Sequence, residues 1–217
     1  MSKKKLNLVP IILEAAFVVL GVVLALAANE WRQNAGHASQ AENAMTTIYD
    51  EVVFNRSAVY ESLGYHFQLT DTLVTFMRPP NGEDGTSVFP DTRIFSRGFI
   101  SPASLLTTAW KTANSTGAVS HMAYEKVLEF SRIYEQQEDY EYQSQQGGQL
   151  VYKKLFEDGY GGMIQNFSNL TTIIYTFIYK ECELVGAYDE LLSGVENVDS
   201  SEDAELSVVC TQMARGR

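Results

Sequence analysis

The feature that most constrains this chain is an unbroken apolar run near its N-terminus, residues 8–28. In a helix rising about 1.5 Å per residue, about 20 apolar residues cross the roughly 30 Å hydrocarbon core of a bilayer. The lysines Lys3 to Lys5 precede the run, and Asn29 and Trp31 follow it. The pattern predicts a transmembrane helix over residues 8–28, preceded by a short N-terminal segment, residues 1–7.

A cleaved signal peptide is the alternative interpretation of this run, because Ala25-Leu26-Ala27 is similar to a cleavage site. The run is longer than the apolar part of most signal peptides, and Glu14 lies inside it. We therefore expect a retained anchor. Because Lys3 to Lys5 favour the cytoplasm, we expect the N-terminus inside and the rest of the chain in the periplasm.

The polar and small residues of the span fall on one helical stripe. Glu14, Val18, Gly21 and Ala25 follow each other at alternating spacings of four and three, and Gly21 and Ala25 form a small-xxx-small pair. One interpretation is a helix–helix interface in which Glu14 bonds to another subunit. Two others stay open: Glu14 is neutral or reaches the headgroups, or it belongs to an ion pathway. Trp31 suits the outer headgroup region.

Charge is divided unevenly along the chain. The net charge is −11, of which the first 32 residues contribute +2 and the remainder −13. Nucleic-acid binding needs clustered lysine and arginine, so this acidic body argues against it and against docking on anionic lipid. The 217 residues are enough for one sizeable domain beyond the anchor.

The body, residues 29–193, has the pattern of a helical domain. A stripe at spacings of four and three predicts a first amphipathic helix of about 35 residues, continuous with the span or bent near Gly36. Asn55, Ser62 and His66 interrupt this stripe, and polar residues there usually fix register or reach a neighbour. The stripe consists of Ala41, Met45, Ile48, Val52, Asn55, Val59, Ser62, His66, Leu69, Leu73 and Phe76.

The remaining segments predict shorter helices. A connection over residues 79–100 is followed by a helix that we expect to start at Ser101-Pro102. A third helix is expected to break at Gly147-Gly148, and a last one covers about 164–192. We predict an all-α fold: a transmembrane helix, then an antiparallel four-helix-bundle-like extracytoplasmic domain, then an acidic tail over residues 194–217.

The two cysteines, Cys182 and Cys210, match no metal-binding pattern. In an oxidising compartment they can form a disulfide that ties the tail to the last helix. Two unrelated thiols are the alternative.

No catalytic, cofactor-binding or metal-binding signature is recognisable in the sequence. The histidines His37, His66 and His121 are dispersed, and the span holds no histidine for a haem. Nucleophile-elbow, phosphate-loop and dinucleotide motifs are missing. We expect no enzyme and no cofactor. Four tyrosines of the third helix suggest either a partner surface or ordinary packing with surface hydroxyls: Tyr134, Tyr140, Tyr142 and Tyr152.

The spacing of Glu14, Gly21, Ala25, Asn29 and Trp31 resembles an E-x6-G-x3-A-x3-N-x-W motif of uncharacterised bacterial single-span proteins with a helical extracytoplasmic domain. The helix that follows carries Glu51 and Asn55, as theirs do, and Thr108 to Trp110 and Tyr134-Glu135 are similar to segments in related proteins. The resemblance covers mainly the first 60 residues. It implies a bacterial inner-membrane protein and carries no activity.

Two functions are compatible with these observations. The first is a non-enzymatic, single-pass accessory or scaffolding subunit of a larger membrane complex, for instance a respiratory or photosynthetic one. Its partners would be other membrane subunits, contacted through the span and the acidic bundle, and the lipid bilayer. The alternative is a periplasmic ligand-sensing bundle that works with a separate transducer.

Overall fold

The computed structural model describes residues 8–77, 92–195 and 210; among these, the regular elements are all helices, with no strand. The predicted all-α class with four helices is confirmed. The expectations for residues 1–7, for most of the connection 79–100 and for nearly all of the tail fall outside the described residues. The elements are α1 (Leu8–Met77), η1 (Thr92–Phe95), α2 (Thr108–Ser115), η2 (Ala118–His121), α3 (Tyr124–Gln165) and α4 (Phe167–Leu192).

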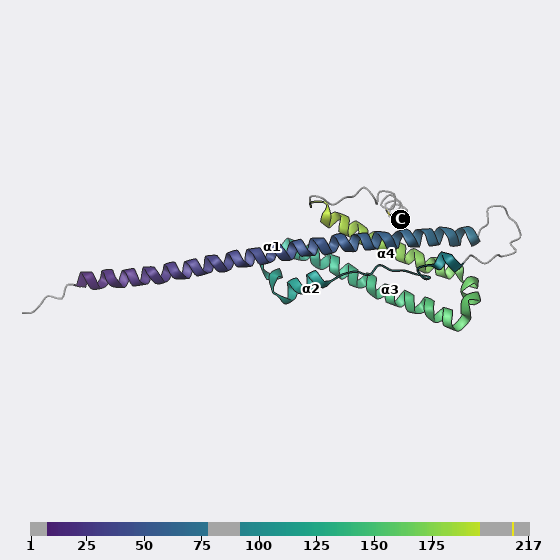
Figure 1. Ribbon diagram of the computed structural model, residues 1–217, viewed down its shortest axis with the longest axis horizontal. Coiled ribbons are helices and arrows are strands. Elements are labelled where there is room, and N and C mark those ends of the chain that lie inside the picture. The colour runs from purple at the N-terminus through teal and green to yellow at the C-terminus, as the bar shows by residue number, and fades with distance from the viewer. Residues whose placement is uncertain (1–7, 78–91, 196–209, 211–217) are drawn as a thin grey trace, which may run out of the picture.

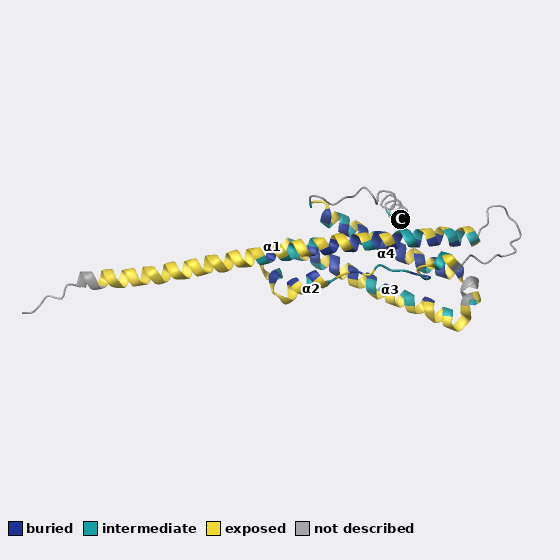
Figure 2. Ribbon diagram, viewed as in Figure 1, coloured by how far each residue is buried: buried dark blue, intermediate teal, exposed yellow. Residues whose placement is uncertain are grey.

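Helix α1 has 70 residues and runs through Gly36 without interruption, which gives it a length of about 105 Å. Its N-terminal half stands free, and its C-terminal half is a long member of the bundle (Figure 1). Every residue from 12 to 39 is exposed, and burial begins at Ala41 (Figure 2). The molecule is therefore a bundle mounted on a single long helix.

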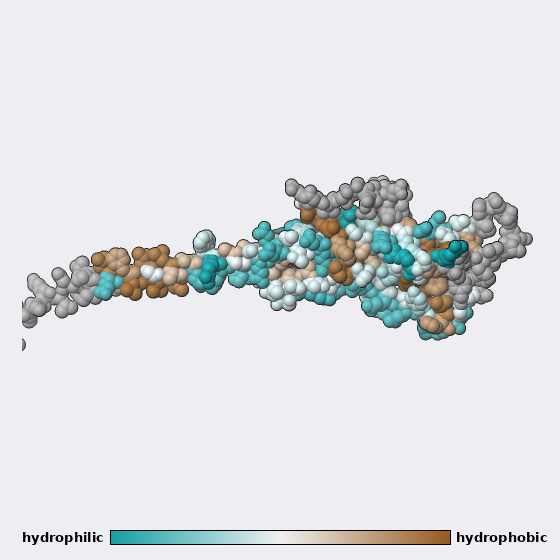
Figure 3. Space-filling view, viewed as in Figure 1, coloured by the Kyte–Doolittle hydropathy of each residue, from teal (hydrophilic) through white to brown (hydrophobic). Residues whose placement is uncertain are grey.

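The exposed half of α1 is apolar along residues 12–28, where large side chains such as Phe17 and Leu26 are more than 60% exposed. Figure 3 shows this band, bounded by hydrophilic residues on the side of the bundle. By length and composition, α1 is the one described helix that could cross a membrane.

The other half of α1 buries the predicted stripe, whose members are all buried or half-buried. It packs most extensively against α4, which runs antiparallel to it, and α4 also packs against α3. The pair Phe76–Phe167 at one end and the pair Arg56–Asp189 near the other fix this antiparallel register. Helix α3 runs parallel to α1, since Glu51 reaches Tyr134 and Ser62 lies at the level of Tyr140.

The expected helix start at Ser101-Pro102 is wrong. Residues 101–107 are extended, and α2 begins only at Thr108. The reason is competition for backbone hydrogen bonds: side chains of α1 and α3 bond to the N–H groups of Ser101, Ala103 and Leu106. These partners replace those that a helix would supply.

The expected break at Gly147-Gly148 is also wrong, because α3 is helical through both residues. Gly147 is needed for packing: a Cβ there would lie 2.9 Å from Cζ of Phe177 on α4. The real turn is at Gly159, whose φ of 68° lies in the left-handed region that glycine adopts easily. There α3 bends towards the start of α4 (Figure 1).

Candidate functional site

An extended segment, residues 98–107, lies between α1 and α3, and we call it the strap. It runs antiparallel to α1, because Ser62 and His66 bond to its first residues and Asn55 to its last. It occupies the position where an antiparallel bundle would have a helix. An extended chain inside a bundle exposes backbone groups that need partners, and polar side chains of the helices supply them.

At the C-terminal end of the strap, the buried Glu51 binds the start of α2. Its Oε2 accepts a hydrogen bond of 2.8 Å from the backbone N–H of Ala109, and its Oε1 one of 2.6 Å from the Tyr134 hydroxyl. The N-cap residue Thr107 makes no capping bond of its own. Glu51 therefore caps α2 from another helix, and its charge suits the positive end of the helix dipole.

One turn further along α1, Asn55 is both donor and acceptor to the backbone of the strap. Its Nδ2 donates to the carbonyl of Leu106 at 2.8 Å, and its Oδ1 accepts from the Leu106 N–H at 2.7 Å. Asn55 is fully buried. The paired bonds resemble a rung between two strands, and they fix both the position and the direction of the strap.

The far end of the strap meets a buried polar node, which consists of Ser62 and His66 of α1, Tyr140 of α3 and Glu181 of α4. His66 Nδ1 lies 3.0 Å from both carboxyl oxygens of Glu181, and its Nε2 accepts from the Ser101 N–H at 3.1 Å. Tyr140 accepts from the Ala103 N–H at 2.8 Å. The node thus joins all three long helices to the strap.

An ion pair between Arg56 and Asp189 is a second polar link between α1 and α4. Arg56 Nε lies 2.6 Å from Asp189 Oδ1, and the guanidinium stacks over Tyr60 at 4.7 Å from the ring centroid. Arg56 is buried, whereas Asp189 is 40% exposed at its side chain. The pair links α1 to α4 at the edge of the core, where water still reaches the carboxylate.

The two buried tyrosines of the site keep their protons. Burial raises the pKa of Tyr134 well above the ordinary value, and its hydrogen bond to Glu51 raises it further. Burial also raises the pKa of Tyr140. Both phenols are therefore fixed hydrogen-bond donors rather than titrating groups in the neutral range. Neither interpretation offered for the α3 tyrosines fits Tyr134 and Tyr140, whose hydroxyls are buried, whereas Tyr142 and Tyr152 are exposed.

The serine, histidine and carboxylate of the node are the residue types of a catalytic triad, but they are hydrogen-bonded to one another in a different order. In a triad the histidine accepts a proton from the serine hydroxyl. Here Ser62 bonds to Glu181 at 2.7 Å, and the accepting nitrogen of His66 is engaged by a backbone N–H. His66 and Glu181 have no exposed surface. The arrangement holds a backbone in place and offers no access to a substrate.

The span residues predicted as an interface are not brought together with any other described part of the chain. Glu14 and Val18 are exposed, and Gly21 has no other atom near the position of a Cβ. Trp31 is 78% exposed. The stripe formed by Glu14, Val18, Gly21, Ala25 and Asn29 faces outwards along the free half of α1.

The two cysteines are joined in a disulfide. Cys182 of α4 and Cys210 have Cα atoms 5.4 Å apart, a usual separation for this bond. The bond anchors the C-terminal part of the chain to α4.

The three histidines separate into two environments. His66 belongs to the node, while His37 and His121 stack on each other with ring centroids 3.9 Å apart. This stack lies where the free part of α1 meets η2, beside the bond from Gln40 to the Thr116 carbonyl. Within the described residues no three or more potential ligands gather into a metal site.

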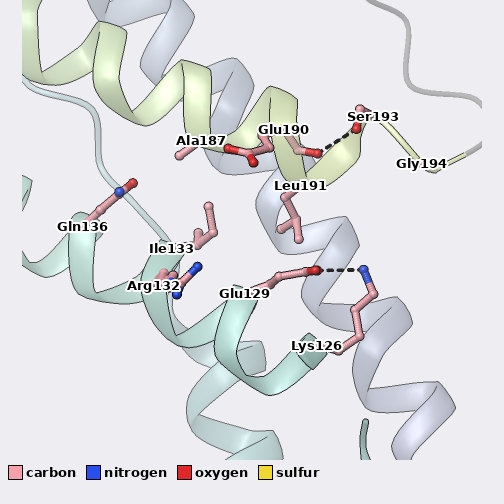
Figure 4. Close-up of a pocket in the computed structure, with 10 residues that line it drawn as sticks. All are labelled: Lys126, Glu129, Arg132, Ile133, Gln136, Ala187, Glu190, Leu191, Ser193 and Gly194. Atoms are coloured by element: carbon pink, nitrogen blue, oxygen red, sulfur yellow. Dashed lines mark hydrogen bonds and ion pairs between the residues drawn. The ribbon is translucent and has the colours of Figure 1, made fainter. Parts of the chain in front are cut away.

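A groove of about 400 Å³ lies between the start of α3 and the end of α4 (Figure 4). Lys126 and Glu129 pair across 2.7 Å on its α3 side, and Arg132 and Glu190 add one charge of each sign. With these charges balanced, the groove has no preference for a charged ligand. Its lining residues are Lys126, Glu129, Arg132, Ile133, Gln136, Ala187, Glu190, Leu191, Ser193 and Gly194.

Comparison with known proteins adds no relative: no family model, no curated protein and no solved structure matches the chain.

Sequence reasoning found the α1 side of this site but missed Tyr140 and Glu181 as partners. A signal for Glu181 exists in the sequence. Glu181 lies on the apolar stripe of α4, four residues before Val185 and three after Ile178, and all three are buried. A carboxylate on a stripe that packs into a core needs a polar partner inside that core. The sequence alone does not show that Glu181 faces Ser62 and His66 of α1, because that contact depends on the antiparallel register of α1 and α4.

Proposed function

We propose that this protein is a non-enzymatic, single-pass accessory or scaffolding subunit of a larger bacterial membrane complex. The observation that carries the proposal is the continuity of α1, which passes from an exposed apolar half into the bundle core without a break. A stiff helix of this kind holds the bundle at a set height above the bilayer. Between the apolar run and the first buried residue, Ala41, lie 12 helical residues, which amount to about 18 Å.

The second observation that supports the proposal concerns the hydrogen bonds of the buried polar residues. Glu51, Asn55 and His66 all bond to the chain's own backbone or to one another. These are the residues a ligand-binding or catalytic bundle would turn towards a cavity, and here they are sealed inside. We therefore expect the protein to recognise its partners through two exposed surfaces, the stripe of the span and the acidic outside of the bundle.

For topology we propose a cytoplasmic N-terminus and a periplasmic bundle. The lysines Lys3 to Lys5 favour this orientation. The Cys182–Cys210 disulfide is in accord with it, because such bonds persist in oxidising compartments. In intact cells, both thiols should resist alkylation until a reductant is added; alkylation without reductant would place the bundle in the cytoplasm.

The test is native gel electrophoresis of the full chain after mild detergent extraction from its own host. We expect a complex of defined size. Substituting Glu14→Leu together with Gly21→Leu should dissociate it, because the two leucines replace the only carboxylate and the smallest residue of the stripe.

The matched control is Ala16→Leu with Ala27→Leu, which places two leucines on the opposite face of the same helix. This pair should leave the complex intact. A wild-type protein that migrates alone would exclude the accessory role. Equal behaviour of the two double variants would show that the span is only a tether.

A further inference from the structure

The node formed by Ser62, His66, Tyr140 and Glu181 contains one more short hydrogen-bond contact than an ionised Glu181 can explain. Four contacts in it each need a side-chain proton. They are His66–Glu181 at 3.0 Å, Tyr140–Glu181 at 3.0 Å, Ser62–Glu181 at 2.7 Å and Ser62–Ser101 carbonyl at 2.6 Å. The side chains that supply those protons can be assigned one at a time.

The protonation of His66 is set by the strap. Its Nε2 faces the backbone N–H of Ser101 at 3.1 Å, and that N–H can only donate. Nε2 must therefore be the accepting, unprotonated nitrogen, and the ring is neutral with its proton on Nδ1. That proton serves the contact with Glu181.

Tyr140 supplies the second proton. Its oxygen accepts from the Ala103 N–H, which leaves the hydroxyl proton for Glu181 Oε1. The phenol stays protonated because burial raises its pKa.

Ser62 supplies the third proton, but it faces two acceptors. The Ser101 carbonyl has no proton to give, so the hydroxyl of Ser62 must donate to it across 2.6 Å. One hydroxyl proton shared between two acceptors cannot align with both, yet the second contact, to Glu181, is also short at 2.7 Å. A proton from Glu181 in the Ser62–Glu181 contact allows both hydrogen bonds to be aligned.

We propose that Glu181 is a neutral carboxylic acid in the folded protein, and that its own proton, donated to Ser62, completes the attachment of the strap to the bundle. Each of the four contacts then holds one proton, and none is left without one.

The electrostatic surroundings agree with this assignment. The groups that bond to Glu181 are Ser62 and neutral His66 from α1 and Tyr140 from α3, and Phe177 lies against the His66 ring from α4. No cationic side chain in the described part of the chain bonds to this carboxyl group. A buried carboxylate without a cation is costly, whereas a neutral acid with all its hydrogen bonds made is not.

The proposal is tested first by infrared spectroscopy of the full chain in detergent at neutral pH. We expect the carbonyl stretch of a protonated carboxyl group, shifted in D₂O and missing from Glu181→Gln. The matched control is Glu190→Gln on the same helix, where the side chain is exposed, and it should keep the band. A wild-type spectrum identical to that of Glu181→Gln in this region would overturn the proposal.

The second readout is the pH dependence of unfolding between pH 7.5 and 9.5. The folded state holds a proton that an unfolded, ionised glutamate does not, so unfolding releases one proton and stability falls as pH rises. The unfolding equilibrium constant of the wild type should rise tenfold per pH unit, and that of Glu181→Gln should stay level. The amide can donate to Ser62 and accept from His66, but its nitrogen cannot accept from the Tyr140 hydroxyl, which contacts the same position, so we expect this variant to fold with reduced stability.

An ionised Glu181 predicts the reverse result. The wild type would then show no slope in this window. Should the variant fail to fold, the slope of the wild type and its infrared band still decide between the two states.

Discussion

The two halves of α1 show opposite relations between polarity and burial. Residues 12–28 are apolar and fully exposed, while the half that enters the bundle buries Asn55, Ser62 and His66. The first half presents apolar surface of the length and composition that could cross a membrane. The second buries polar groups because its neighbour is an extended backbone, which must be hydrogen-bonded wherever water is excluded.

In the exposed half of α1, backbone hydrogen bonds are satisfied within the helix, so folding places few demands on its side chains. In the bundle half, side chains also satisfy the backbone of the strap, so their identity and order matter. For folding stability, substitutions should therefore be tolerated on the exposed half of α1 and costly on its buried half.

The largest effect is expected at alkaline pH and confined to the bundle. Burial raises the pKa values of Tyr134, Tyr140 and Tyr188, so their contribution to stability is present below the ordinary tyrosine pKa of about 10 and is lost as pH rises above it. Three phenols that ionise only on unfolding lower the free energy of unfolding by about 4 kcal/mol per pH unit. The part of the tyrosinate absorbance that comes from these three buried phenols should appear together with the loss of helical circular dichroism.

The control is the number of protons released. Tyr188→Phe should reduce the slope by one proton, and Tyr124→Phe, at a side chain that is 74% exposed, should leave it unchanged. Tyrosinate signal from the buried tyrosines before helix loss would contradict the prediction. The free half of α1 contains no tyrosine and should remain helical in detergent throughout.

The second prediction compares two asparagines of the same helix. Asn55→Ala leaves the N–H and carbonyl of Leu106 without their partners, and we expect it to lower the free energy of unfolding by about 2–4 kcal/mol. Asn34→Ala, in the exposed part of α1, should change it by less than about 0.5 kcal/mol. Denaturant unfolding in detergent measures both, and similar losses would show that α1 is uniformly sensitive.

Much of the fold could be predicted from the sequence, because the signals were local and periodic. The span, the long first helix and the polar interruptions of its stripe each depend on spacing within one segment. His66 was expected to fix register or reach a neighbour, and the structure shows it bonded to both the strap and α4.

The strap could not be predicted in this way. Ser101-Pro102 has a good helix-start pattern, yet Ser62, His66 and Tyr140 outcompete the helix by bonding to this segment. Those donors and acceptors lie 33 or more residues away along the chain, so no local pattern contains them. The same is true of Glu181, whose partners became visible only with the antiparallel register of α1 and α4.

The smallest effect concerns the two neighbouring glycines that looked like a helix break. Alanine at either position gains helix propensity, about 0.5–1 kcal/mol over glycine. At Gly148 the added Cβ meets only Ile100 Cδ1 at 3.7 Å, an ordinary contact, so Gly148→Ala should be stabilising. At Gly147 the Cβ would lie 2.9 Å from the ring of Phe177, which is itself buried beside His66.

Gly147→Ala must push that ring towards the node, and overpacking of this kind costs about 1–3 kcal/mol, which outweighs the propensity gain. We expect the thermal midpoints of the two variants to move in opposite directions from the wild type. The pair separates packing from propensity because both residues lie in the same helix, one position apart. If both alanines stabilised the protein equally, α3 and α4 would not approach closely at Gly147, and the node would have room that the structure does not give it.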